Sequence, residues 1–358
     1  MTLFDSPSFE GHEAVHAFSD EKSGLKTIIA VHSTARGPAA GGCRMWPYPD
    51  AEAALEDALR LSRAMSFKNA MADLELGGGK AVIIGDARTQ KSSTLFEAFG
   101  ACVDQLGGRY WTAEDVGVSP ADLVHARKRT AYVAGLEGHP AASGDPSPVT
   151  AEGVFRGVRL CVQRALGRDL EGVRVAIQGV GHVGGYLADK LHAAGAKLIL
   201  TDVNAELLHA VAARTEAKVV APGAIFDVDC EVFAPCALGG AISAETLPRL
   251  KARVIAGGAN NQLADAETGR AVFNHGMLYA PDYVINGGGI INVAGEIRAL
   301  EKGEAFDPAW VDAKLDRLTL TLEEVLDRAR AEHRPTNEVA TEVAKARITI
   351  AAEKRAAA

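Results

Sequence analysis

A glycine-rich turn between a predicted strand and a predicted helix constrains the fold of this 358-residue chain more than any other feature. The turn, Gly179-Val180-Gly181-His182-Val183-Gly184, follows the apolar run Arg174–Gln178 and opens a helical pattern. Gly179 permits a tight turn, Gly181 lets the backbone approach a pyrophosphate, and Gly184 lets the helix pack closely on the strand. The free N–H groups of the helix N-terminus favour phosphate.

Asp202 lies 18 residues past Gly184, at the end of the next predicted strand. A carboxylate there accepts hydrogen bonds from ribose hydroxyls and repels a 2′-phosphate. The pattern therefore predicts a dinucleotide site that prefers NAD over NADP. The alternative is a glycine-rich turn of an α/β sheet without a ligand.

Strand and helix patterns alternate from Val173 to about Pro281, which predicts a parallel sheet with helices on both faces. The first 135 residues read as a mixed α and β region. Residues 134–149 are rich in glycine and proline and form the predicted hinge, after which Thr150 caps a helix that ends at Gly167. The expected strands are 26–32, 81–84, 109–112, 174–178, 197–201, 230–234, 253–256 and 277–280, and the expected helices include 50–65, 92–106, 205–212, 243–250 and two that begin near Asp307 and Thr336.

Charge and composition exclude several classes of protein. The chain has 38 Lys and Arg against 46 Asp and Glu, and this net charge of −8 disfavours nucleic acid and anionic lipid as partners. No apolar run approaches the roughly 20 residues that cross a bilayer. The acidic N-terminus lacks the order of a signal peptide, so we expect a cytoplasmic protein. Five scattered cysteines without a CxxC pair favour neither disulfides nor a metal site.

Three glycines precede Lys80 and the apolar run Ala81–Ile84. A lysine at the mouth of a buried strand is partly desolvated, which disfavours the charged ammonium and allows it to act as a base at neutral pH. The run Gly77–Lys80 also resembles a phosphate loop, but it lacks the earlier glycine and the following Ser or Thr of that motif. A surface lysine after a loop is the remaining alternative.

Three further positions bear polar groups suited to a substrate. Lys68 follows the helix that we expect to end near Met65, and Gly41-Gly42 offers backbone N–H groups to an anion. Asp115, next to Glu114, follows a predicted strand, where sites in α/β proteins gather. The alternatives are a solvated lysine and a carboxylate that caps a loop or helix.

Several runs, in this order, resemble the amino-acid dehydrogenases of the glutamate/leucine/phenylalanine/valine dehydrogenase group, nearest to the leucine enzymes. The resemblance covers about residues 10 to 350. It rests on Gly37–Trp46 (GPAAGGCRMW), Lys68–Ala70, Gly77–Lys80, Thr112–Gly117, Gly144–Thr150 (GDPSPVT), Ala234–Gly239 (APCALG), Gly258–Gln262 (GANNQ) and Ala280–Asn286 (APDYVIN).

The resemblance implies a fold and a domain division. The fold class is α/β with two domains and a cleft between them. Residues 1–138, joined by helices of 331–358 that return to it, would form a mixed α/β substrate and oligomerisation domain. Residues 139–330 would form a Rossmann-type NAD-binding domain. Homo-oligomers, dimers or octamers, are expected.

It also implies roles for individual residues. Lys68 resembles the lysine that binds the substrate α-carboxylate, helped by Gly41 and Gly42, and Lys80 resembles the catalytic lysine. Asp115 resembles the carboxylate that shuttles protons. Thr150 and Asn261 resemble positions that contact the nicotinamide and the reacting end of the substrate.

The implied reaction is reversible oxidative deamination of an L-amino acid with NAD, giving a 2-oxo acid and ammonia. A hydride leaves the substrate Cα, and Lys80 then activates a water that attacks the resulting iminium carbon. A non-catalytic dinucleotide-binding protein of the same fold is the alternative.

Positions that line the side-chain pocket in leucine enzymes correspond to Ala40, Ala113, Ile290 and Val293, which are all apolar. This favours leucine and other branched-chain substrates over glutamate, with phenylalanine as the alternative, since one methylene in such a pocket is worth only about 1–3 kcal/mol. Two residues depart from the leucine pattern, with Gly79 in place of alanine and Asp145 in place of asparagine.

Overall fold

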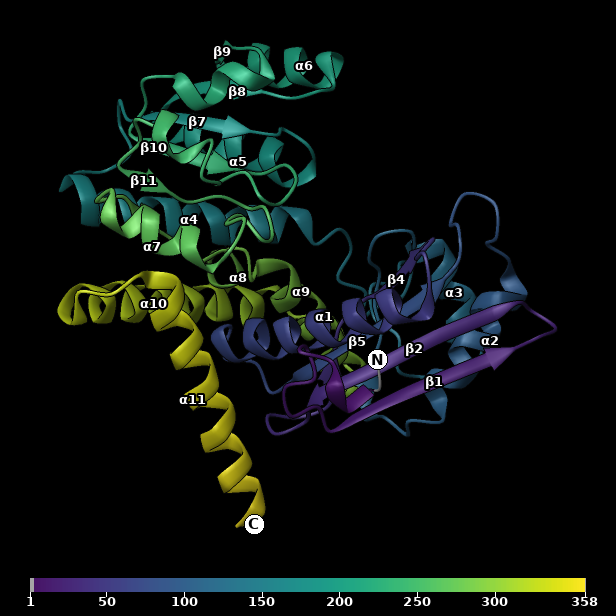
Figure 1. Cartoon of the computed structure of the whole chain (residues 1–358). Helices are drawn as coiled ribbons and strands as arrows, with labels where there is room; N and C mark the ends of the chain where they lie inside the picture. The colour runs from purple at the N-terminus through teal and green to yellow at the C-terminus, as the bar shows by residue number, and fades with distance from the viewer. Residues whose placement is uncertain (1–2, 358) are drawn as a thin grey trace. The chain divides into compact units, whose positions relative to one another are not determined.

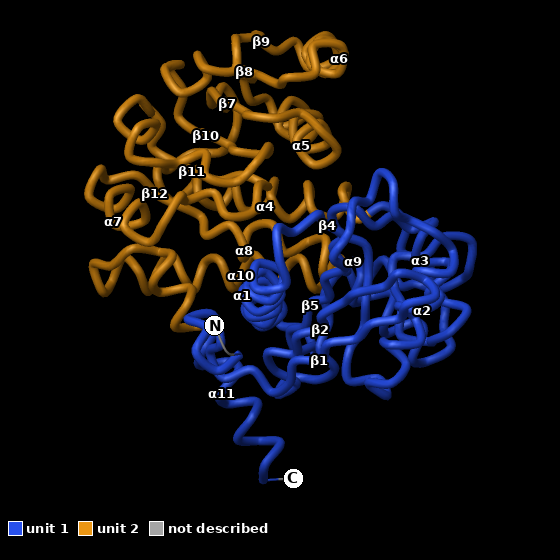
Figure 2. The backbone as a smooth tube through the Cα atoms, turned by 45° about the vertical axis from the view of Figure 1, so that its right-hand side comes forward, with its two compact units in different colours: residues 1–145, 292–311, 344–358 blue, residues 146–291, 312–343 orange. Residues whose placement is uncertain are grey.

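The computed structural model describes residues 3–357, which form two compact units (Figure 2). Unit 1 comprises the described residues up to Asp145, together with Asn292–Val311 and Ala344–Ala357. Unit 2 comprises Pro146–Ile291 and Asp312–Val343. The chain therefore crosses between the units at residues 145/146, whereas the functional boundary expected at 138/139 stays a prediction.

Unit 2 is built on a six-stranded parallel sheet in the order β12-β11-β10-β7-β8-β9. In Figure 1 the labels of β11, β10, β7, β8 and β9 follow this order from bottom to top. The chain starts in the middle of the sheet at β7, runs outward to β9, and then returns to the other side of β7 with β10. This is the doubly wound Rossmann order, and it confirms the predicted parallel sheet. The strands are β7 Arg174–Gln178, β8 Lys197–Thr201, β9 Lys218–Val219, β10 Val232–Pro235, β11 Val254–Ile255 and β12 Leu278–Tyr279.

The helices of unit 2 begin and end mostly where the sequence signals lie, because those signals satisfy backbone groups locally. Gly167 ends α4 in the left-handed conformation at φ 68°. Two predictions were wrong. The helix expected over 243–250 is only the short 3-10 turn η3, Leu247–Arg249. Helix α4 begins at Ser147, so Thr150 lies in its first turn and donates its hydroxyl to the Pro146 carbonyl. The other helical elements are α5 His182–Ala193, α6 Ala205–Thr215, η2 Pro222–Asp227, α7 Ala266–Asn274 and α8 Asp282–Ile285.

Unit 1 contains a mixed sheet in the order β1-β2-β5-β3-β6, with β4 also paired to β5. Its strands are β1 Ala14–Asp20, β2 Leu25–Ser33, β3 Ala39–Ala40, β4 Cys43–Trp46, β5 Gly77–Ile84 and β6 Tyr110–Trp111. In β2, Ile28 and Ala30 pack with residues of helix α1, whereas Ile29 and Val31 belong to the core with helix α2. The strand is a continuous apolar run because both of its faces are covered.

Each of the first three helices of unit 1 begins at a residue whose side chain caps it. Asp50 caps α1 (Ala51–Met71), Ser92 caps α2 (Ser93–Asp104), and Ser119 forms a capping box at α3 (Pro120–Arg127). Helix α1 continues to Met71, so the expectation that it ends near Met65 was wrong. Lys68 therefore lies in its last turn rather than beyond it.

Three more helices complete the fold. Helix α9 (Gly288–Lys302) enters unit 1 at Asn292, and α10 (Pro308–Glu332) passes from unit 1 into unit 2. Helix α11 (Thr336–Ala356) lies in unit 2 as far as Val343 and in unit 1 from Ala344. None of the helices within residues 3–357 combines the length and apolar character of a membrane-spanning segment. Over the same residues all five cysteines are free thiols, and no cluster of candidate metal ligands occurs.

Candidate active site

The glycines before Lys80 belong to β5 itself rather than to a loop in front of it, so the strand begins four residues earlier than predicted. A Cβ at Gly78 would lie 2.1 Å from the amide nitrogen of Ser66 on α1, and one at Gly79 would lie 2.6 Å from the Tyr110 ring. The glycines therefore allow close packing of α1 and Tyr110 on the strand. They do not form a phosphate loop. Glycine rather than alanine stands at position 79 because the ring of Tyr110 leaves no room for a Cβ there.

Lys80 is buried in this strand, with 5% of its surface exposed. Its Nζ lies 2.9 Å from Oδ2 of Asp115, whose side chain is 25% exposed. Asp115 follows β6 in the sequence, and the backbone of Cys43, which belongs to β4, is bonded to the carbonyl of Ala113. The sheet thus brings together the two residues predicted to be catalytic. The lysine is thus enclosed by the protein, whereas the carboxylate is partly accessible to solvent.

Arg44 completes this group, and the sequence analysis did not single it out. Its Nε donates to Oδ2 of Asp115 at 2.9 Å, the same oxygen that faces Lys80, and its Nη1 donates to Asp57 on α1 at 3.0 Å. Asp57 also accepts from the hydroxyl of Tyr48 at 2.7 Å. Arg44 therefore links the carboxylate of Asp115 to Asp57 on α1. The run GCRMW contained the only signal, an arginine in an otherwise apolar strand.

These charges set the ionisation of Asp115. Burial raises the pKa of this carboxyl, but the adjacent Lys80 and Arg44 cations together outweigh burial and hold its pKa below the usual range. Asp115 is therefore an anion at neutral pH. The ionised carboxylate of Asp115, which can accept a proton, therefore lies next to the amine of Lys80.

Gly41 and Gly42 lie at the same edge of the sheet. A Cβ at Gly42 would lie 2.9 Å from Cβ of Asp115, and one at Gly41 would lie 1.9 Å from the Gly79 carbonyl oxygen. The Gly41 carbonyl accepts the hydroxyl of Tyr110 at 2.6 Å. The close packing of this segment on Gly79 and Asp115 thus requires glycine at both positions. Lys68 is half-buried near the end of α1, two residues after Ser66, whose amide packs against Gly78.

The four apolar residues predicted to contact the substrate side chain divide between the units. Ala40 and Ala113 are buried in unit 1, on β3 and just after β6. Val293 is half-buried on α9 in unit 1, and Ile290 is half-buried on the part of α9 that belongs to unit 2. The assignment of a substrate pocket to these residues stays a prediction.

In unit 2 the glycine turn has the geometry expected of a pyrophosphate cradle. Gly179 has φ 94°, and a Cβ at Gly184 would lie 2.0 Å from the Gly179 carbonyl oxygen. A Cβ at Gly181 would meet nothing within 4 Å, and this glycine opens α5 without a side-chain cap. No side chain caps the first N–H groups of α5, and the space beside Gly181 is open. These residues therefore fit the phosphates of a dinucleotide.

Asp202 lies directly after β8, next to this turn. Its Oδ2 accepts from the Val180 amide at 2.7 Å and its Oδ1 accepts from the Asn204 amide at 2.8 Å. Thr150 is half-buried in the first turn of α4. Asn261 is exposed and has φ 50°, a left-handed conformation that is uncommon outside glycine.

Glu296 is a second residue that sequence reasoning missed. It is fully buried on α9 and accepts four hydrogen bonds from the predicted hinge loop. The donors are the amides of Gly135 at 3.0 Å, Leu136 at 3.2 Å and Ser143 at 3.1 Å, and the hydroxyl of Ser143 at 2.7 Å. One carboxylate thus fixes the unit 1 part of that loop. A glutamate within an apolar helix was the available signal.

Comparisons with known proteins agree with this geometry. The family model described as Glu/Leu/Phe/Val dehydrogenase, dimerisation domain, matches residues 12–132. The model described as Glutamate/Leucine/Phenylalanine/Valine dehydrogenase matches residues 143–209 and 197–356.

Individual relatives extend over almost the whole chain. A leucine dehydrogenase of Geobacillus stearothermophilus is 47% identical over 349 residues, which are 97% of this chain and 94% of that protein. A phenylalanine dehydrogenase of Bacillus thermotolerans is 43% identical over 97% of this chain and 91% of its own length. The crystal structure of an L-tryptophan dehydrogenase from Nostoc punctiforme superposes with a TM-score of 0.85 at 38% identity, covering 98% of this chain and 99% of that one.

Proposed function

The chain belongs to the glutamate/leucine/phenylalanine/valine dehydrogenase family, and on that basis we propose that it oxidises a branched-chain L-amino acid with NAD to the 2-oxo acid and ammonia, reversibly. The observation that supports this proposal best is the buried Lys80 amine, 2.9 Å from an ionised Asp115. An amine and a carboxylate in this arrangement are suited to moving protons, as the hydrolysis of an imine requires.

The residues of the glycine turn in unit 2 would hold the cofactor. A nicotinamide dinucleotide bound there would supply the acceptor for the hydride that leaves the substrate Cα. The open position at Gly181 and the N-terminus of α5 would hold the pyrophosphate, and Asp202 would accept hydrogen bonds from the ribose hydroxyls. Because Asp202 also repels a 2′-phosphate, NAD is the proposed cofactor rather than NADP.

Lys80 and Asp115 would carry out the proton transfers. Loss of hydride leaves an iminium at the substrate Cα, and water adds to that carbon while its proton passes to Nζ of Lys80. Lys80 then protonates the amino nitrogen. The carbinolamine collapses to the 2-oxo acid as ammonia leaves, and its hydroxyl proton passes to Nζ of Lys80. Asp115 receives protons from Lys80 through Oδ2, which keeps the amine available as a base.

The remaining residues of unit 1 would hold the substrate. Lys68 would pair with its α-carboxylate, assisted by the backbone at Gly41 and Gly42. The apolar residues Ala40, Ala113, Ile290 and Val293 would contact an aliphatic side chain, since none of them offers a cation to a distal carboxylate. Thr150 and Asn261 would orient the reacting groups.

Phenylalanine is the second candidate substrate. Ala40 and Ala113 are both small, and a phenylalanine dehydrogenase is 43% identical to this chain. The resemblance to leucine enzymes at Ala113 and Val293 favours an aliphatic substrate. For the assembly, the match of residues 12–132 to a dimerisation domain supports a homo-oligomer, a dimer or an octamer.

An amino-acid panel tests the proposal. The 20 amino acids are offered with NAD, and then with NADP, and reduced cofactor is followed by its absorbance. We expect turnover with leucine, valine and isoleucine, and weaker turnover with phenylalanine. The absence of turnover with every amino acid, together with retained NAD binding, would favour the non-catalytic alternative.

A further inference from the structure

Unit 2 contains a second pocket, at the opposite edge of the sheet from the glycine turn. Arg253 directly precedes β11 and Met277 directly precedes β12, so both mark the amino ends of the parallel strands, whereas the glycine turn follows the carboxyl end of β7. The pocket has a volume of about 430 Å³. We propose that it binds a small organic anion with an apolar or aromatic body.

The floor of the pocket is apolar. It is formed by the end of α7 and the start of β12 on one side and by the last turns of α10 on the other. Phe273 is 39% exposed, which is high for a large apolar side chain. A volume of several hundred cubic ångströms with apolar walls is typical of small-molecule sites. The apolar residues are Val272, Phe273, Met277, Leu278, Leu326 and Ala329.

The ionisable groups around this floor are mostly cationic. Arg164, Arg253, Arg330, Arg334 and His333 line the pocket, and Asp327 is the one carboxylate among the lining residues. Asp327 is already paired, because Nη1 of Arg164 lies 2.9 Å from its Oδ1. The pocket therefore has an excess of positive charge.

Two of these cations have no counter-ion among the residues that the structure describes. Within residues 3–357, the side chains of Arg253 and Arg330 make no ion pair or hydrogen bond, although both are exposed at the pocket. The guanidinium group is planar and weakly hydrated, and it pairs well with carboxylates and other oxyanions. Two unpaired guanidinium groups beside an apolar floor favour an anion that is joined to an apolar body.

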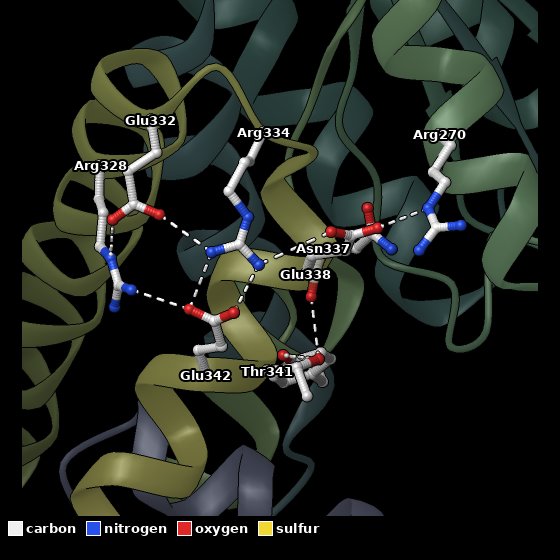
Figure 3. A network of polar contacts seen from close by, with 9 residues as sticks. Arg270, Arg328, Glu332, Arg334, Asn337, Glu338, Thr341 and Glu342 are labelled. Atoms are coloured by element: carbon white, nitrogen blue, oxygen red, sulfur yellow. Dashed lines mark hydrogen bonds and ion pairs between the residues drawn. The ribbon is translucent and has the colours of Figure 1, made fainter.

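The wall that carries Arg334 is held by a network of ion pairs at the turn between α10 and α11 (Figure 3). Arg334 pairs with Glu342 at 2.5 Å and with Glu332 at 3.0 Å, while Arg328 bridges the same two glutamates. Arg334 is thereby neutralised and fixed. The network holds this wall of the pocket in place, and neither Arg253 nor Arg330 takes part in it.

The chemistry of the pocket discriminates between classes of ligand. Inorganic phosphate would pair with the arginines but leave the exposed Phe273 in water. A neutral apolar molecule would cover Phe273 and leave two cations without partners. Only a molecule that has both an anionic group and an apolar body would pair with the arginines and also cover Phe273.

The test uses 1-anilinonaphthalene-8-sulfonate, an aromatic organic anion whose fluorescence rises on binding, with the full-length protein saturated with NAD. The test variant is Arg253→Glu combined with Arg330→Glu. The control variant is Lys128→Glu combined with Arg129→Glu. It reverses the same number of charges at two exposed cations of unit 1 that lie outside this pocket. Thermal midpoints and NAD affinity establish that each variant is folded.

We expect a saturable site in the wild type and the control, with the dye bound at least 10-fold more weakly by the test variant. Equal affinity of the dye for all three proteins would overturn the proposal. So would a change in the sedimentation coefficient of the test variant alone, since that result would identify the face as an interface between copies.

A crystal of the wild-type protein soaked with the dye provides a second measurement that does not depend on the variants folding. We expect the sulfonate beside Arg253 and Arg330 and the rings over Phe273. Dye located only at the glycine turn or only on other surfaces would contradict the proposal.

Discussion

Nζ of Lys80 and Nε of Arg44 both lie 2.9 Å from the same oxygen, Oδ2 of Asp115. The two cations differ in what they can do. The guanidinium of Arg44 stays protonated at any physiological pH, whereas an amine such as that of Lys80 can exchange its proton. One carboxylate oxygen is therefore held by a permanent cation while it faces a proton donor and acceptor.

Replacing Lys80 tests its role as the base. In Lys80→Ala we expect turnover of leucine to fall about 10²–10⁴-fold, the usual contribution of a general base, while NAD binding is retained. Stopped-flow absorbance and calorimetric NAD titration measure the two quantities. Lys128→Ala, at a lysine with a 54% exposed side chain, is the matched control. Near-normal turnover in Lys80→Ala would refute the assignment.

Arg44 is proposed to act through Asp115 as a positioning residue. Arg44 and Lys80 lower the pKa of Asp115 against the opposing effect of burial, so Arg44→Gln should raise that pKa. The acid limb of the kcat/KM profile should then move to higher pH, while Arg44→Lys should restore part of the shift. A uniform loss of activity at all pH values would instead indicate a purely structural role.

Asp202 is proposed to select NAD. Its carboxylate lies beside the glycine turn and already accepts the Val180 amide at 2.7 Å. In Asp202→Ser we expect the kcat/KM ratio of NADP to NAD to rise at least 10-fold, because the repulsion of a 2′-phosphate is removed. Steady-state kinetics with both cofactors measures this ratio. Glu206→Gln, an exposed acidic residue on α6, should leave it unchanged.

Glu296 is expected to stabilise the loop 135–143. Glu296→Gln places an amide donor opposite backbone donors, and each unsatisfied buried group costs about 1–3 kcal/mol. We expect a lower free energy of unfolding in urea and faster proteolytic cleavage within the loop. Glu301→Gln, on the exposed side of the same helix, is the control. Unchanged cleavage would contradict the role of Glu296.

His32 should make stability depend on pH. Burial, helped by the nearby His12 and Arg63, lowers the pKa of His32 to about 4, from an ordinary value of 6.5. The unfolded chain therefore binds a proton below pH 6.5 that the folded chain binds only below about pH 4. Stability is fully present above pH 6.5 and falls as pH drops toward 4, by up to about 3 kcal/mol.

Urea unfolding of wild type and His32→Gln between pH 4 and 7 measures this dependence. The variant should show a flatter profile, with the slope due to the buried His12 remaining. His209→Gln, at an exposed histidine, should keep the wild-type slope. An identical slope in all three proteins would exclude the His32 contribution.

Local sequence signals predicted many of the elements correctly. Helices α1 and α2 begin within one residue of the expected positions, where Asp50 and Ser92 cap them, because capping needs only a side chain and the next few amides. The alternating elements after Val173 predicted the parallel sheet and the glycine turn at its centre. The sequence also indicated Lys80 and Asp115, although their roles rest on a family resemblance.

The contacts between distant residues were decided by the tertiary structure. Arg44 and Asp115 are 71 positions apart, and Glu296 and Gly135 are 161 apart, so no periodicity of the sequence could link them. The role of Gly77–Gly79 was likewise invisible, because it depends on α1 and Tyr110 packing against β5. Sequence determines what short segments can form, since their hydrogen bonds are local, whereas the partner of a buried charge is known only once the sheet has brought remote strands together.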